Sequence, residues 1–140
     1  METILAPLPL GTSDFSALRK SGQIYVDKTR LIYTLASKRQ KFFLSRPRRF
    51  GKSLLLSTFE SLFKYGLRDF HGLEIESLWK DENTYQVIRL DFSNLKDFSS
   101  VEEFSELLDQ YLLDTLTVNR LVSPIKTDKE GLRAFIGWLA

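Results

Sequence analysis

Apolar and polar positions alternate with a helical period in four parts of the chain. Apolar residues three or four positions apart, with polar residues between them, predict an amphipathic helix in each part. The expected helices cover residues 14–20, 28–38, 53–65 and about 101–112. Ser13, Asp27 and Ser100 precede three of them as expected N-caps, and Glu103 forms a capping box with Ser100.

Two shorter apolar runs have the composition of β-strands. Residues 41–44 form a compact apolar run that predicts a buried strand, and residues 85–92 contain a second candidate. The order strand, loop, helix, strand, helix is typical of an α/β protein whose parallel strands are joined by a right-handed crossover. Two strands are fewer than the about five of an average sheet. We therefore expect an α/β fold with an incomplete parallel sheet flanked by helices, and a last helix from Asp128 that runs to the chain end.

Composition and charge exclude several classes of protein. With 43% hydrophobic residues and 11 Phe among 140 residues, the chain has ample material for a core, which argues against disorder. It has no Cys and one His, His71, so a thiolate zinc site, a disulfide scaffold and a Ser-His-Asp triad are not expected. The net charge of +2 is too small to indicate wholesale binding of nucleic acid or membrane.

The sequence pattern predicts neither a membrane-spanning helix nor a signal peptide. No apolar run approaches the about 20 residues of a membrane helix. The first 13 residues lack a basic start and contain Pro7 and Pro9, unlike a signal peptide. We expect a cytoplasmic protein that does not contact a membrane.

The segment with the clearest chemistry lies between the first strand candidate and the helix at 53–65. Gly51, Lys52 and Ser53 match the end of the phosphate-binding loop pattern, in which Gly and four residues precede Gly-Lys-Ser/Thr. Arg46 stands where that pattern has its leading Gly.

The residue types of this loop suit phosphate. The first N–H groups of a helix lack partners within the helix and carry partial positive charge, and Gly51 lets the backbone approach an anion. Lys52 is expected to reach the β- and γ-phosphates, and the Ser53 hydroxyl to bind Mg²⁺. Arg46, Arg48 and Arg49 add guanidinium groups that favour bidentate contacts with phosphate. Two other interpretations stay open: a solvated surface loop, or a basic loop that binds a nucleic-acid backbone.

Four ordered motifs carry a resemblance to a known family. They are Leu-Pro-Leu-Gly-Thr-Ser-Asp-Phe at 8–15, Ile-Tyr-Val-Asp-Lys-Thr-Arg-Leu-Ile at 24–32, Arg-Pro-Arg-Arg-Phe-Gly-Lys-Ser at 46–53 and Val-Ile-Arg-Leu-Asp-Phe-Ser at 87–93. Together they resemble the N-terminal part of the AAA-ATPase-like family of bacterial proteins, over residues 8 to at least 113. That family tolerates Arg-Pro-Arg-Arg-Phe ahead of Gly-Lys, so Arg46 is compatible with it.

The resemblance implies that the chain binds ATP with Mg²⁺. The cofactor-binding residues it implies are Tyr25, Val26, Arg46, Pro47, Arg48, Arg49, Phe50, Gly51, Lys52 and Ser53. Tyr25 and Val26 are assigned to the adenine side, and Ser53 to the metal. No catalytic residue is assigned.

The resemblance also implies what this chain lacks. Family members carry an apolar strand ending in paired acids, of the Walker B type, and many have a further domain that resembles PD-(D/E)XK nucleases. Nothing in residues 95–140 matches either. Residues 1–140 are therefore expected to be the N-terminal part of one AAA-ATPase-like domain, with negligible ATP hydrolysis alone, and whether the chain is an enzyme stays open. A missing C-terminal half or a nuclease-like domain is an expected partner.

Two acidic residues have expected structural roles. Asp27 is expected mainly as a helix cap, and Asp91 as a loop-orienting residue, because Arg89 interrupts the run before it.

The competing function is a non-catalytic interaction or nucleic-acid-binding module that uses the basic cluster at residues 46–52. A fragment without independent function is the third hypothesis.

Overall fold

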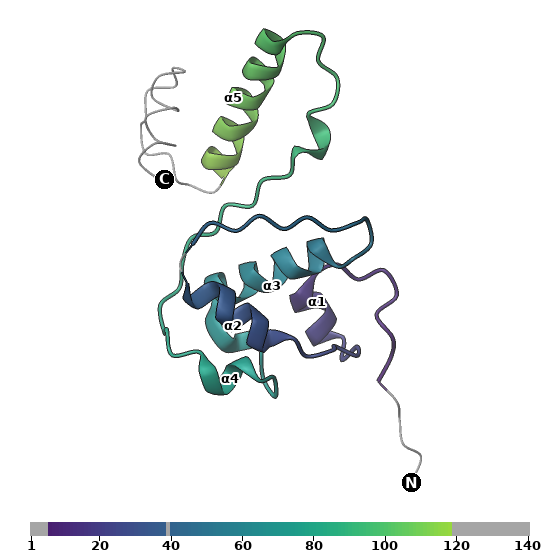
Figure 1. The fold of residues 1–140 in the computed structure, drawn as a ribbon, viewed down its shortest axis with the longest axis vertical. Coiled ribbons are helices and arrows are strands. Elements are labelled where there is room, and N and C mark those ends of the chain that lie inside the picture. The colour runs from purple at the N-terminus through teal and green to yellow at the C-terminus, as the bar shows by residue number, and fades with distance from the viewer. Residues whose placement is uncertain (1–5, 39, 119–140) are drawn as a thin grey trace. The chain divides into compact units, whose positions relative to one another are not determined.

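A computed structural model of the chain describes residues 6–38 and 40–118. The structure divides into two units, Met1–Val87 and Ile88–Ala140. The first unit contains α1 (Phe15–Lys20), α2 (Thr29–Ser37), α3 (Lys52–Tyr65), the 3-10 turn η1 (Gly66–Asp69) and α4 (Ile75–Leu78). The second contains the 3-10 turn η2 (Phe92–Asn94) and α5 (Val101–Val118) (Figure 1).

The core of the first unit is built by side chains from all four of its α-helices and from the residues around η1. Its buried members are Phe15, Ile32, Leu62, Phe70, Leu73, Ile75 and Trp79. Helix α3 places Leu55, Phe59 and Leu62 against this core, at the helical spacing expected from the sequence. Burying side chains of this size contributes about 1.5–3 kcal/mol each to folding.

Carboxylates begin the first two helices. Asp14 is the N-cap of α1, since the Ala17 N–H donates to its Oδ1 at 2.7 Å, and the expected cap, Ser13, is one residue too early. The predicted N-cap of α2, Asp27, is also one residue too early, since Lys28 holds that position and the helix begins at Thr29, but the Thr29 N–H still donates to Asp27 Oδ1 at 2.8 Å. The second oxygen of Asp27 accepts from the Glu74 N–H at 2.8 Å, which ties α2 to α4. Although desolvation alone would raise it, these hydrogen bonds lower the pKa of Asp27.

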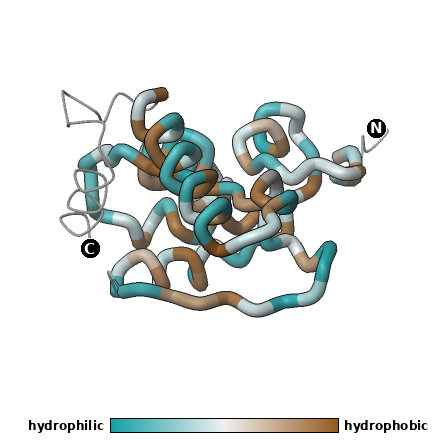
Figure 2. Tube along the Cα trace, turned by 90° about the horizontal axis from the view of Figure 1, so that it is seen from above, coloured by the Kyte–Doolittle hydropathy of each residue, from teal (hydrophilic) through white to brown (hydrophobic). Residues whose placement is uncertain are grey.

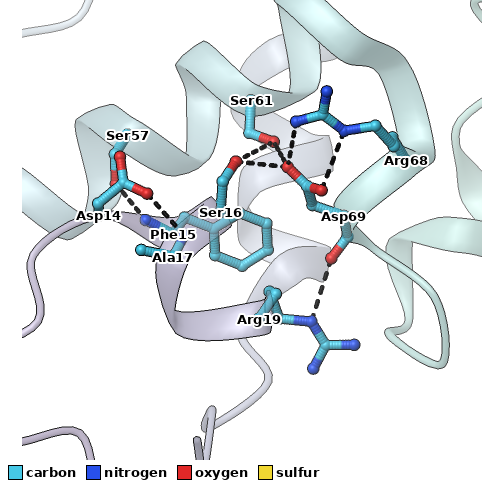
Figure 3. Close-up of polar contacts among 9 residues, drawn as sticks. All are labelled: Asp14, Phe15, Ser16, Ala17, Arg19, Ser57, Ser61, Arg68 and Asp69. Atoms are coloured by element: carbon cyan, nitrogen blue, oxygen red, sulfur yellow. Dashed lines mark hydrogen bonds and ion pairs between the residues drawn. The ribbon is translucent and has the colours of Figure 1, made fainter. Parts of the chain in front are cut away.

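A buried carboxylate joins α1, α3 and η1 (Figure 3). The side chain of Asp69 is 6% exposed, and its Oδ2 accepts hydrogen bonds from the hydroxyls of Ser61, at 2.8 Å, and Ser16. Arg68 donates to both oxygens at 3.1 Å, and Arg19 Nε donates to the backbone carbonyl of Asp69 at 3.1 Å. The Arg68 guanidinium, together with the two hydroxyls, holds the pKa of Asp69 well below its usual range.

The second unit confirms two local predictions. Ser100 Oγ accepts from the Glu103 N–H at 3.1 Å, as in a capping box, while the Glu103 carboxylate accepts from the N–H of Ser99, at 2.8 Å. Asp91 orients the loop before α5, because its Oδ1 accepts from the Ser93 N–H at 2.9 Å. Its own N–H donates to the Tyr111 hydroxyl at 2.7 Å.

The predicted α/β fold is wrong. Residues 6–38 and 40–118 contain helices and turns but no β-strand, so no parallel sheet joins residues 41–44 to residues 85–92. The first of these runs is exposed, not buried, with Phe43 94% accessible. A β-strand forms only when its backbone can hydrogen-bond to a neighbouring strand. The β-propensity of a residue reflects packing against such neighbours, so an apolar run of strand-like composition does not form a strand by itself. The helix expected from Asp128 lies outside the described residues.

Candidate functional site

The loop at residues 46–51 leads into the first turn of α3. The helix begins at Lys52, within the range expected from the Gly-Lys-Ser pattern, although the segment before the loop is not a strand. Its N-cap, Gly51, has no side chain to cap the helix. The first N–H groups of α3 therefore have no partner within the helix and lie at its positive end.

Left-handed backbone conformations alternate along this loop. Arg49 has φ +65° and Gly51 has φ +71°, whereas Phe50 between them is not left-handed. Such alternation turns successive backbone N–H groups toward a shared concavity that suits an anion. A left-handed conformation costs a residue such as Arg about 1–2 kcal/mol, and strain of this kind is concentrated at functional sites.

Lys52, at the end of the loop, is hydrogen-bonded to the backbone at its start. Its Nζ donates to the carbonyl oxygens of Arg46, at 2.5 Å, and Pro47, at 3.4 Å, and its side chain is half-buried. An ammonium group has three N–H donors, so one donor stays available for an anion. The arrangement brings together the start and the end of the predicted phosphate loop.

The same geometry explains how Arg46 fits where the pattern has Gly. Arg46 does not have a positive φ, so no glycine is needed at this position for backbone reasons. Its contribution to Lys52 is a backbone carbonyl, which any residue type provides. Sequence reasoning missed this contact, because comparing side chains with a motif does not reveal which backbone oxygens are used.

Ser53 and the remaining basic residues lie at the surface. Ser53 is exposed in the first turn of α3, and Arg48 and Arg49 are exposed in the turn before it. Within the part of the chain that the structure describes, no three His, Asp or Glu side chains gather closely enough to hold a metal ion. The hydroxyl of Ser53 is thus the loop's own candidate oxygen ligand for Mg²⁺.

The two residues assigned to the adenine side differ in their surroundings. Tyr25 packs against the core with its ring edge-on to Phe15, at 5.2 Å between centroids, and burial raises the pKa of its phenol. Val26 is 70% exposed. Their contact with a base stays a prediction, in which Val26 is the more accessible side chain.

Replacing Gly51 by alanine is expected to destabilise the first unit by about 1 kcal/mol, because alanine tolerates a φ of +71° poorly. No atom lies within 4 Å of the added Cβ, so backbone conformation is the only expected cause. Thermal unfolding of Gly51→Ala and of the unaltered chain measures the effect. Gly51→Asn is the matched control, since asparagine enters this conformation more easily, and equal losses in both variants would contradict the explanation.

Comparison with known proteins gives one family and one relative. A family model described as AAA-ATPase-like, predicted AAA-ATPase, matches residues 9–134. An uncharacterised protein encoded in the vnfD 5′ region of Azotobacter chroococcum mcd 1 is 33% identical over 133 residues, which are 94% of this chain and 25% of that protein. The chain therefore spans about a quarter of the relative's length. No solved structure matches the chain significantly.

No helix among residues 6–38 and 40–118 combines the length and the apolar character needed to cross a bilayer.

Proposed function

This chain belongs to the AAA-ATPase-like family of predicted AAA-ATPases, and we propose that its loop at residues 46–53 binds the phosphates of ATP together with Mg²⁺. One structural observation carries the proposal. Lys52 spans the loop to the carbonyls of Arg46 and Pro47 and keeps one donor free, at the uncapped start of a 14-residue helix.

Each part of the loop has a task in this proposal. The backbone N–H groups at the start of α3 bind phosphate oxygens, with Gly51 allowing close approach. Lys52 neutralises charge on the outer phosphates. Arg48 and Arg49 are exposed within the loop and supply further guanidinium donors, which suit phosphate geometry better than ammonium groups do.

The described residues fit part of a magnesium site. Ser53 has an exposed hydroxyl in the first turn of α3, the position from which a phosphate loop supplies its metal ligand. Mg²⁺ usually keeps several waters and takes few protein ligands when phosphate oxygens share its coordination. Bound in this way, the ion would screen the phosphate charges, while the chain's own role is to hold the phosphates in place.

The assignment of Tyr25 and Val26 to the base is part of the same proposal. Tyr25 is anchored in the core, and Val26, at the next position, is exposed. An adenine ring would therefore contact the Val26 side chain and the backbone on either side of it.

Calorimetric titration of the purified chain with ATP, with and without Mg²⁺, tests the proposal. We expect Mg²⁺ to strengthen ATP binding in the unaltered chain. In Ser53→Ala, the affinity for ATP in the presence of Mg²⁺ should fall about tenfold, which removes most of this gain, because one oxygen ligand is lost. Ser45→Ala is the matched control, since this serine is exposed but precedes the loop. Absence of ATP binding, or a full Mg²⁺ effect in Ser53→Ala, would contradict the proposal.

A further inference from the structure

Helix α3 buries three hydroxyl side chains, those of Ser57, Thr58 and Ser61. Brown and teal residues alternate along the helices in Figure 2, so polar positions of this kind occur between the apolar ones. Buried hydroxyls need hydrogen-bond partners. Thr58 donates to the Leu54 carbonyl of its own helix at 2.8 Å, and Ser61 donates to Asp69 Oδ2 at 2.8 Å. Of the three, Ser57 is the one that is bonded to the N-terminal segment, residues 7–15.

The Ser57 hydroxyl is bonded to the backbone on both sides of the start of α1. It accepts from the Phe15 N–H at 2.9 Å and donates to the Ser13 carbonyl at 3.1 Å (Figure 3). Phe15 is the first residue of α1, so its N–H has no acceptor within that helix. Because Ser57 is 4% exposed, water does not reach this contact to replace the hydroxyl.

The N-terminal segment is also fastened at its other end, to the stretch that contains the residues assigned to the base. The Ile24 N–H donates to the Pro7 carbonyl at 2.9 Å. The ring of Tyr25, the next residue, is edge-on to Phe15. The N-terminal segment therefore connects the base side of the proposed site to α3, and all of these contacts lie within the first unit.

The contact at Ser57 is close to the phosphate loop. Figure 1 shows α1 beside the first part of α3. A helix rises 1.5 Å per residue, so Ser57 lies about 7–8 Å along α3 from Lys52. In a bound nucleotide, the ribose and the α-phosphate separate the base from the outer phosphates. A site that binds both ends of the nucleotide must hold its base side at a fixed distance from the loop.

We propose that Ser57 is a positioning residue, which sets the distance between the phosphate loop and the base-binding stretch at residues 24–26. The inference rests on the proposed function of the loop and deepens it, because it names a residue on which base recognition depends without touching the nucleotide. Loss of the Ser57 hydroxyl leaves the buried Phe15 N–H unpaired and releases the N-terminal segment from α3. The loop contacts made by Lys52 do not involve Ser57 and remain.

Calorimetric titrations with Mg²⁺-ATP and with inorganic tripolyphosphate, which has neither base nor ribose, test the proposal. In Ser57→Ala the affinity for ATP should fall about tenfold, the scale of one lost hydrogen bond. The affinity for tripolyphosphate should stay within about twofold, because the loop keeps its shape. Partial unfolding would lower both affinities equally. The ratio of the two affinities therefore reports the position of the base side and does not respond to a merely structural loss.

Ser61→Ala is the matched control, since Ser61 is buried one turn further along α3 and is bonded to Asp69 instead. It should lower the melting temperature and leave the ratio of the ATP and tripolyphosphate affinities unchanged. If Ser57→Ala does not fold, Ser57→Cys gives the second reading. A thiol is similar in size but is a weak donor and acceptor, so this ratio should fall by a smaller factor, about threefold.

The outcomes separate this inference from the proposed function. Equal losses of ATP and tripolyphosphate affinity in the Ser57 variants, or no loss of either, would overturn the positioning role and leave phosphate binding by the loop intact. A change of the ratio in Ser61→Ala as large as that in Ser57→Ala would also overturn it. If the unaltered chain bound no ATP, the proposed function would fail, and this inference with it.

Discussion

Replacing Lys52 by alanine is expected to weaken the binding of Mg²⁺-ATP about 100-fold while leaving the helices of the first unit folded. The variant loses a charged donor to the phosphates, and a charge-assisted hydrogen bond contributes about 1.5–3 kcal/mol. It also loses the two contacts from Nζ to the carbonyls of Arg46 and Pro47, so the loop is no longer held in one shape. Both effects act on the nucleotide, because the core lies elsewhere in the unit.

Calorimetric titration of both proteins with Mg²⁺-ATP measures the loss, and circular dichroism measures the fold. Lys20→Ala is the matched control, since this exposed cation at the end of α1 is outside the loop, and its affinity should stay within twofold. Lys52→Arg keeps the charge, yet a planar guanidinium does not reproduce the ammonium geometry, and it should also bind poorly. If Lys52→Ala weakened binding only two- to threefold, the loop would act as a diffuse basic patch.

Helix positions could be predicted from this sequence because their signals are local. Asp27 lies two residues before Thr29, and Ser100 three before Glu103, so both contacts are decided within one helical turn. Apolar spacing within α3 indicated which of its side chains face the core. The strands could not be predicted in the same way, since pairing of residues 41–44 with residues 85–92 depends on contacts far apart in the chain.

The position of the candidate loop was predictable, but its conformation was not. Gly51, Lys52 and Ser53 located it at the start of a helix, where the structure also places them. The left-handed conformation of Arg49 and the carbonyls that hold Lys52 have no sequence signal, because they depend on the path of the whole loop. Asp69 was missed for a related reason: one of its partners, Ser16, is 53 residues away.

Replacing Asp69 by alanine is expected to lower the free energy of unfolding by about 3 kcal/mol, which is among the largest losses from a single side chain in the first unit. The change leaves the Ser61 hydroxyl without its acceptor and the Arg68 guanidinium without its carboxylate. Breaking a buried charged pair costs about 3–5 kcal/mol. The low end applies, because the partner Arg68 is 48% exposed and water can solvate it afterwards. Urea unfolding at pH 7 measures the loss. Glu82→Ala, an exposed acid of the same unit, should change stability by less than about 0.5 kcal/mol.

The same carboxylate predicts how stability depends on pH. The Arg68 guanidinium and the hydroxyls of Ser16 and Ser61 lower the pKa of Asp69 in the folded protein, while in the unfolded chain it returns to about 3.9. A carboxylate whose pKa is lowered by folding stabilises the folded protein at any pH above its pKa in the unfolded chain. This stabilisation is lost as acid protonates the carboxylate in the folded protein. We therefore expect the free energy of unfolding to decrease as the pH falls below about 4. In Asp69→Asn this decrease should be much smaller, because no titrating group remains at that position. An equally steep decrease in Asp69→Asn would show that other carboxylates, such as Asp27, dominate acid unfolding.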